Sequence, residues 1–191
     1  MKISKPNFFK SPLEHYKDAI SKLMQLEPEI LREKSVKPKL PFVYNLVYKD
    51  AQKPHITAFT FGLSSLDLQS TEKKKEICIQ MNSSNLQWAL VAAYLVNQLR
   101  GDCPFNEGEI IKFGQQIEAE SNLNAFVVIN CLIPNAQQYL LEGRKTSNIQ
   151  IMQLVPIYEQ EITSIAQLGL NAFIQKLQAE LHNPKRDLLK F

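Results

Sequence analysis

One stretch constrains the fold of this chain more than any other: residues 148–161, which read Asn-Ile-Gln-Ile-Met-Gln-Leu-Val-Pro-Ile-Tyr-Glu-Gln-Glu. Residues 149–158 are rich in apolar and β-forming side chains, as in a strand that is buried within a sheet. A helix is expected to begin at Glu159 or Gln160, where acidic residues suit the positive end of the helix dipole. A buried strand that runs directly into an amphipathic helix requires a sheet with helices packed against it.

Helix and strand signals elsewhere complete this plan. A capping box at Ser11 and Glu14 predicts a helix that ends before Pro28. A second box at Ser84 and Gln87 predicts an apolar helix over residues 86–100. The order of elements predicts an α+β (mixed α/β) fold, with a single mixed β-sheet flanked by helices. Strands are expected at 42–48 and 56–61, and these two form a hairpin. Further strands are expected at 76–81, 109–113 and 125–133, of which the last is a central strand. A turn is expected at 28–33 and an edge segment at 139–141.

We expect one domain over residues 1–191. An N-terminal helical segment occupies residues 1–34, and a loop that contains two prolines separates it from a core at 42–181. Residues 182–191 then form a short tail. The sequence shows no internal repeat that would indicate a second unit.

Composition excludes several classes of protein. Hydrophobic residues make up 45% of the chain and charged residues 21%, which is ordinary for a globular domain, and the net charge of +3 is too small to indicate nucleic-acid binding. The longest apolar run, residues 88–96, is too short to span a membrane, and no signal peptide is evident. Three cysteines are too few for a disulfide framework. We therefore expect a cytoplasmic protein.

Catalytic and cofactor-binding motifs are not evident. His15, His55 and His182 are scattered and have no partner at metal-ligand spacing, so neither a metal nor a cofactor is predicted. Cys103 is the one cysteine placed in a loop, where an accessible thiolate beside a base could act as a nucleophile. A Cys103 enzyme therefore stays open as an alternative.

A carboxylate pair is the second catalytic alternative. Glu118 and Glu120 are two residues apart within an acidic group that also includes Glu107 and Glu109. Two carboxylates can act as acid and base if one is buried and its pKa rises. On a strand the same spacing would place both on one solvent-exposed face, where they could steer a basic partner.

The segment after the last strand contains the candidate binding residues. Glu159 and Glu161 suit the first turn of a helix, which is one interpretation of these acids. The other interpretation is a polar rim beside an exposed Tyr158, a residue type that is enriched at protein interfaces. On this second interpretation, Tyr158, Glu159 and Glu161 would contact a protein partner.

Several segments, taken in order, resemble the suppressor of fused (SUFU) domain family in its compact bacterial form. The resemblance covers residues 44–181. It is carried by Thr60-Phe61-Gly62-Leu63-Ser64, by Glu76-Ile77-Cys78-Ile79-Gln80, by the helix with Trp88 that ends near Gly101 and precedes Glu109-Ile110-Ile111, and by Leu154-Val155-Pro156-Ile157-Tyr158-Glu159-Gln160-Glu161.

This resemblance implies a protein-binding module rather than an enzyme, with a mixed sheet flanked by helices. Compact bacterial members resemble immunity proteins, which neutralise a partner toxin by binding it, so a toxin is the expected partner. Two alternatives remain open: an enzyme that uses Cys103 or the carboxylate pair, and a structural protein that only oligomerises. Whether the chain is a monomer or a homodimer is also left open.

Overall fold

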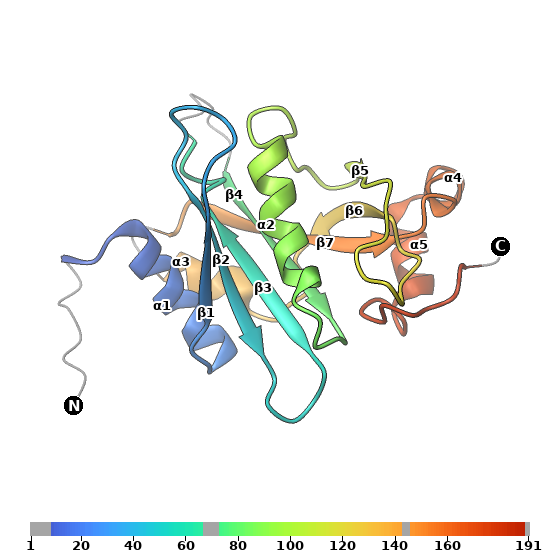
Figure 1. The fold of residues 1–191 in the computed structure, drawn as a ribbon, viewed down its shortest axis with the longest axis horizontal. Helices are drawn as coiled ribbons and strands as arrows, with labels where there is room; N and C mark the ends of the chain where they lie inside the picture. Colours follow the sequence, from blue (N-terminus) through green and yellow to red (C-terminus); the bar gives the residue numbers. More distant parts are fainter. Residues whose placement is uncertain (1–8, 67–72, 143–145, 190–191) are drawn as a thin grey trace.

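A computed structural model describes residues 9–66, 73–142 and 146–189 (Figure 1). Within these residues the strands form one seven-stranded sheet in the order β1-β2-β3-β4-β7-β6-β5. The strands are β1 (Glu29–Glu33), β2 (Val43–Lys49), β3 (Ile56–Phe61), β4 (Lys74–Met81), β5 (Ile110–Lys112), β6 (Ala125–Asn130) and β7 (Ile149–Ile157). The helices are α1 (Pro12–Met24), α2 (Gln87–Leu99), α3 (Ala136–Leu141), α4 (Glu161–Leu168) and α5 (Leu170–Leu177).

The sheet is mixed, as predicted. Neighbouring strands are antiparallel except for β4 and β7, which pair in parallel from Lys74 opposite Ile149 to Ile79 opposite Leu154. A parallel pair needs a long crossover connection, and α2 together with β5, β6 and α3 supplies it. The predicted hairpin is β2 and β3.

Helices cover the sheet on both faces (Figure 1). α2 packs across β1 to β4 on one face, where Trp88 lies fully buried in the largest apolar cluster. α1 and α3 cover the opposite face, where Tyr16 and Ile20 of α1 pack in one cluster with Phe59 of β3, and α5 covers the adjoining part of that face with Phe173. The sheet is therefore the middle of three layers.

Strand β7 has the double burial that its composition predicts. Met152 and Leu154 face the α2 side, whereas Ile151 and Val155 face the clusters under the opposite helices. The strand expected at residues 125–133 is β6, an interior strand between β7 and β5 that is covered on both faces, as predicted. It ends at Asn130, three residues earlier than expected.

Two short segments were assigned wrongly from sequence. The turn expected at 28–33 is the edge strand β1, because pairing with β2 outweighs the helix-forming side chains of Glu-Ile-Leu-Arg-Glu. The edge segment expected at 139–141 belongs to helix α3, which begins after Asn135 adopts a left-handed conformation. Both errors arise because tertiary contacts decide the structure of short segments.

The helix ends confirm one predicted cap and correct another. Ser11 and Glu14 form the predicted capping box of α1. At α2 no side chain caps the helix in this way, and the Asn85 side chain accepts from the Gln87 backbone N–H instead. The predicted last helix is divided at Gly169 into α4 and α5.

Residues 182–189 pack against the core rather than trailing from it. The Asn82 backbone N–H donates to the His182 carbonyl at 2.7 Å, and the Arg186 side chain is buried. This packing fixes the end of the chain beside the start of α4, where the candidate binding residues lie.

Candidate protein-binding surface

The Gly-Leu-Ser turn after β3 is built around a buried carboxylate. Glu76 of β4 accepts hydrogen bonds from the backbone N–H groups of Gly62 and Ser64, at 2.8 and 2.9 Å. It also accepts from the hydroxyls of Ser64 and Thr60, at 2.6 and 2.8 Å. Burial raises the pKa of Glu76 above its ordinary value, although these four hydrogen bonds lower it. The two sequence segments that carried the resemblance here are therefore one structural unit.

Gly62 connects this carboxylate to a buried arginine. Its N–H donates to Glu76, and its carbonyl accepts from Arg100 Nη1 at 3.3 Å. Arg100 also donates to the Pro41 carbonyl at 2.6 Å, and burial lowers the pKa of its guanidinium. Gly62 has a φ of 144°, and a Cβ there would lie 2.8 Å from the Phe42 carbonyl oxygen. Only glycine fits this position without strain.

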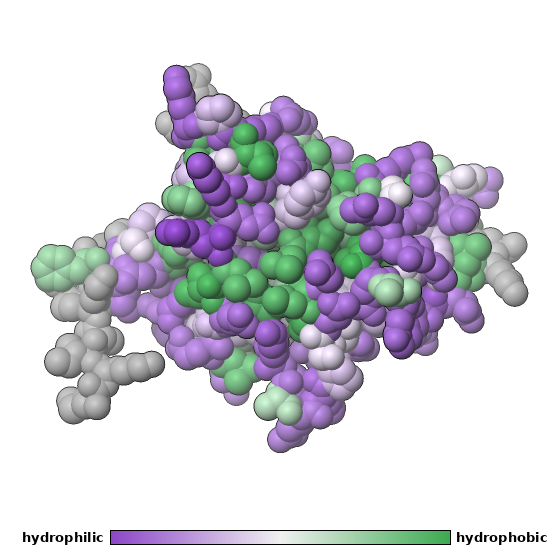
Figure 2. Space-filling view, in the orientation of Figure 1, coloured by the Kyte–Doolittle hydropathy of each residue, from purple (hydrophilic) through white to green (hydrophobic). Residues whose placement is uncertain are grey.

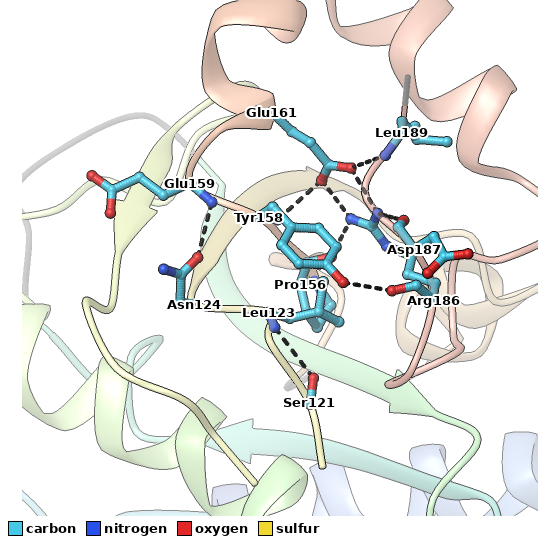
Figure 3. A network of polar contacts seen from close by, with 10 residues as sticks. All are labelled: Ser121, Leu123, Asn124, Pro156, Tyr158, Glu159, Glu161, Arg186, Asp187 and Leu189. Atoms are coloured by element: carbon cyan, nitrogen blue, oxygen red, sulfur yellow. Dashed lines mark hydrogen bonds and ion pairs between the residues drawn. The ribbon is translucent and has the colours of Figure 1, made fainter. Parts of the chain in front are cut away.

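A second buried carboxylate holds the C-terminal segment in place (Figure 3). Glu161 and Arg186 form a two-pronged ion pair of 2.7 and 2.5 Å, and each side chain is only 1% exposed. Glu161 also accepts from the backbone N–H groups of Tyr158 and Leu189, at 3.0 and 3.1 Å. Glu161 thus lies in the interior, where it joins the start of α4 to the last described residues.

The two other predicted binding residues lie around this ion pair, nearer the surface. The Tyr158 hydroxyl donates to the Arg186 carbonyl at 2.6 Å, and the Arg186 guanidinium lies 5.1 Å from the centre of the tyrosine ring. Glu159 points away from both in Figure 3, with its side chain 41% exposed. It forms an ion pair of 2.8 Å with Lys112. The structure brings the three residues together but gives only Glu159 an open carboxylate.

A groove lined by both apolar and polar side chains lies on the α2 face of the molecule. It has a volume of about 380 Å³ and runs between α2 and the segment that follows β5. Tyr94 is 47% exposed there, and its ring packs edge-on against Phe113 with 6.1 Å between ring centres. Figure 2 shows this face, with hydrophobic residues gathered across its middle. The lining is Glu33, Gln87, Leu90, Val91, Tyr94, Phe113, Gln115, Gln116 and Ile117.

The groove adjoins the predicted binding residues. Lys112, the partner of Glu159, directly precedes Phe113 in the chain. The Asn124 carbonyl accepts from the Phe113 N–H, and the Asn124 side chain accepts from the Glu159 N–H at 2.9 Å. Exposed aromatic side chains in a groove that also contains polar groups are typical of a protein-binding surface.

Sequence reasoning missed this groove. A helix that is apolar over most of its circumference is usually buried against a sheet, yet Leu90 of α2 is only partly buried and Tyr94 is half exposed. A helix that is apolar on its solvent side as well was the available signal.

The environment of Cys103 does not favour a nucleophile. The residue lines a pocket of about 290 Å³ near Lys75 and Asp102, and no histidine is among the described residues that line it. Burial raises the pKa of the Cys103 thiol, which disfavours the thiolate.

Glu118 and Glu120 line one pocket, but the two carboxylates have different partners. Glu118 accepts from the Trp88 indole N–H at 2.6 Å and from the Ser83 hydroxyl at 3.3 Å. Glu120 is exposed and pairs with Lys185. Residues 118 and 120 lie outside any strand, so the expected shared face is not formed, and Glu118 instead anchors the loop to α2.

Two of the scattered histidines meet. The rings of His55 and His182 lie edge to face with 6.4 Å between their centres, and His182 Nδ1 donates to the Gln80 carbonyl. His15 lies on α1, on the other face. In the part of the chain that the structure describes, no group of three or more His, Cys, Asp or Glu side chains is placed to hold a metal ion.

None of the helices in the described residues is both long enough and apolar enough to cross a membrane.

Comparison with known proteins identifies relatives. The family profile described as Suppressor of fused protein (SUFU) matches residues 41–188. A crystal structure of a SUFU homologue from Neisseria gonorrhoeae is similar at 14% identity and a TM-score of 0.67, covering 93% of this chain and 96% of that one. The crystal structure of the Sufu–Fu complex is similar at 14% identity and a TM-score of 0.60, covering 94% and 93%. No curated protein matches the sequence.

Proposed function

The chain belongs to the suppressor of fused family, as its sequence motifs predicted, and we propose that it is a protein-binding module without catalytic activity of its own. The groove beside Tyr94 and Phe113 carries this proposal. A half-exposed tyrosine that packs against a second aromatic ring in a groove resembles the aromatic anchors that supply most of the energy of protein interfaces. A relative with the same fold has been crystallised as the Sufu–Fu complex, which also supports protein binding.

We further propose that the chain is a bacterial, cytoplasmic immunity protein whose partner is a toxin. The groove would cover part of the toxin surface, so that the toxin could no longer reach its own target. Glu33 in the groove and Glu159 beside it would favour a basic contact region on the toxin, because acidic side chains at an interface steer a basic partner.

The predicted residues Tyr158, Glu159 and Glu161 have different roles in this proposal. Glu159 would contact the partner directly. Its ion pair with Lys112 would either break on binding or remain while the Glu159 carboxylate also contacts the partner. Tyr158 would contribute the exposed part of its ring. Glu161, which is buried, would act indirectly by holding Tyr158 and the C-terminal segment in position.

Co-expression with the partner tests the proposal. Tagged protein is used to retain partners from its native lysate, and each retained protein is then expressed alone and together with this chain. We expect one stoichiometric partner that stops growth when expressed alone and is harmless when this chain is present. A retained protein with no toxicity would contradict the immunity role and leave protein binding in place.

Two tyrosines on opposite faces provide a matched pair of variants. Tyr94→Ala should weaken partner binding by about 30-fold, because a central aromatic anchor contributes about 2 kcal/mol. Tyr139→Ala, on helix α3 at the other face, should leave binding unchanged. Equal binding by both variants would mean that the partner does not bind at the groove beside Tyr94. If no partner is retained from the lysate, the proposal of a binding module loses its support.

A further inference from the structure

Two cysteine side chains meet across the sheet. Cys78 is a fully buried residue of β4, and Cys131 follows Asn130, the last residue of β6. β7 lies between these strands, as Figure 1 shows, yet the two sulfur atoms are only 3.7 Å apart. Both side chains therefore reach over β7, on the face that α1 and α3 cover.

The two thiols have unequal surroundings. Cys131 is only partly buried, and hydrogen bonds from Cys78 and from the Ile133 backbone lower the pKa of its thiol. Burial, followed by the hydrogen bond and charge of Cys131, raises the pKa of Cys78. Cys131 is also the more accessible thiol of the two, which suits it to react first with an oxidant, with Cys78 as the thiol next to it.

We propose that Cys131 and Cys78 form an oxidation site, at which a hydroperoxide converts the two thiols into a disulfide between β4 and the segment after β6. The Cys131 thiolate attacks one oxygen of the hydroperoxide, and the O–O bond breaks. The other oxygen takes up a proton and leaves as an alcohol, or as water when the oxidant is hydrogen peroxide. Cys131 is then a sulfenic acid.

The Cys78 sulfur completes the reaction by attacking the Cys131 sulfur. The S–O bond breaks, the S–S bond forms, and the hydroxyl leaves as water with the proton of the Cys78 thiol. One hydroperoxide thus accepts two electrons from two thiols, and no other reactant is needed.

The backbone around Cys131 can supply the movement that this bond requires. Disulfide sulfurs lie about 2.05 Å apart, so the two atoms must approach by about 1.7 Å. Asn130 is the last residue paired with β7, and α3 begins only at Ala136. Residues 131–135 are irregular, so they can move without breaking the ladder between β6 and β7.

Mass spectrometry of the full-length protein tests this site. Reduced protein is treated with hydrogen peroxide, blocked with N-ethylmaleimide and measured intact. We expect a product that has lost two hydrogen atoms and carries maleimide on Cys103 alone, and a digest should contain peptides joined through Cys78 and Cys131. Cys103 is the internal control, because burial raises the pKa of its thiol and it packs against the cluster on the α2 face.

Variants separate the two steps. Cys78→Ala should stop the reaction at a Cys131 sulfenic acid that dimedone traps, whereas Cys131→Ser should abolish both products. Cys103→Ser should react at the wild-type rate, and thermal unfolding of each variant verifies that it is folded. The proposal is overturned if Cys103 oxidises before Cys131, if Cys131 proceeds to sulfinic acid without a link to Cys78, or if peroxide leaves both thiols unchanged.

Discussion

Glu76 and Glu161 are both buried acids, but the protein holds them in opposite ways. Glu76 accepts four hydrogen bonds, all from neutral donors on Thr60, Gly62 and Ser64. Glu161 is paired directly with Arg186. The first acid shapes a local turn, whereas the second joins two distant segments.

The difference shows what each carboxylate needs in order to stay buried. Neutral donors can satisfy the oxygens of Glu76 whether or not the group carries a charge, so an uncharged amide can replace it. At Glu161 the neighbouring guanidinium is itself buried and requires a negative charge. Charge is therefore expected to matter more at position 161 than at position 76.

The largest expected effect is at the Glu161–Arg186 pair. Glu161→Ala should lower the free energy of unfolding by about 3–5 kcal/mol, because it leaves Arg186 charged and buried without its partner. Glu161→Gln should cost nearly as much, since an amide cannot neutralise the guanidinium. Urea unfolding monitored by circular dichroism measures both.

A surface ion pair nearby is the control for this prediction. Glu159→Gln removes the contact with Lys112, whose side chain is 63% exposed, and should cost less than about 1 kcal/mol. The double variant Glu161→Met, Arg186→Met should recover much of the lost stability, because it removes both buried charges. If Glu161→Ala costs no more than Glu159→Gln, the ion pair does not hold the C-terminal segment in place.

A smaller effect is expected at Glu76. Glu76→Ala should cost about 3 kcal/mol because it leaves several buried donors without an acceptor, whereas Glu76→Gln should cost about 1 kcal/mol or less. The contrast between Gln at 76 and Gln at 161 is the direct test of the comparison. Equal losses at the two positions would mean that Glu76 also depends on its charge, through Arg100.

The pH dependence of stability provides a second measurement at Glu76. Burial raises the pKa of this carboxyl above its ordinary value of 4.5. A group whose pKa is higher in the folded chain binds a proton more tightly there, so its contribution to stability is lost as pH rises through the raised pKa. Wild-type protein should therefore lose stability relative to Glu76→Gln as pH rises from about 4.5. A difference that changes in the opposite direction would show that hydrogen bonding outweighs burial.

The two acids also differ in how much of their setting could be predicted from sequence. The turn at Gly62 and the strand with Glu76 are close in the chain, and both belong to segments that resemble the family in sequence. The structure shows that these two segments are in contact. The Glu161–Arg186 pair was not predicted, because Arg186 lies in a segment expected to be a free tail. Sequence periodicity identifies the faces of single elements, but it does not show which distant charged residues are buried together.

The same limit applies to the candidate binding surface. The buried strand β7 and the helix after it were predicted, since apolar composition determines both. The groove at Tyr94 depends on how the loop after β5 approaches α2, and no local pattern encodes that approach. Helix α2 was predicted correctly as an element, while its exposed apolar face was not.

Gly62→Ala should have a smaller effect than Glu161→Ala or Glu76→Ala, and it tests whether the Glu76 turn depends on backbone geometry as well as on its carboxylate. Gly62→Ala should lower the free energy of unfolding by about 2 kcal/mol, because the new Cβ would lie 2.8 Å from the Phe42 carbonyl at a φ of 144°. Gly114→Ala is the matched control, since Gly114 also has a positive φ, of 76°, but has no atom within 4 Å of the added Cβ; it should cost about 1 kcal/mol. Urea unfolding measures both variants. The double variant Gly62→Ala, Glu76→Gln should lose less stability than the sum of the losses of its two single variants, because both changes weaken the same hydrogen bond from the Gly62 N–H. Simple additivity would show that the carboxylate and the Gly62 backbone act independently, whereas equal losses from the two glycine variants would show that the close approach of Gly62 to Phe42 costs nothing.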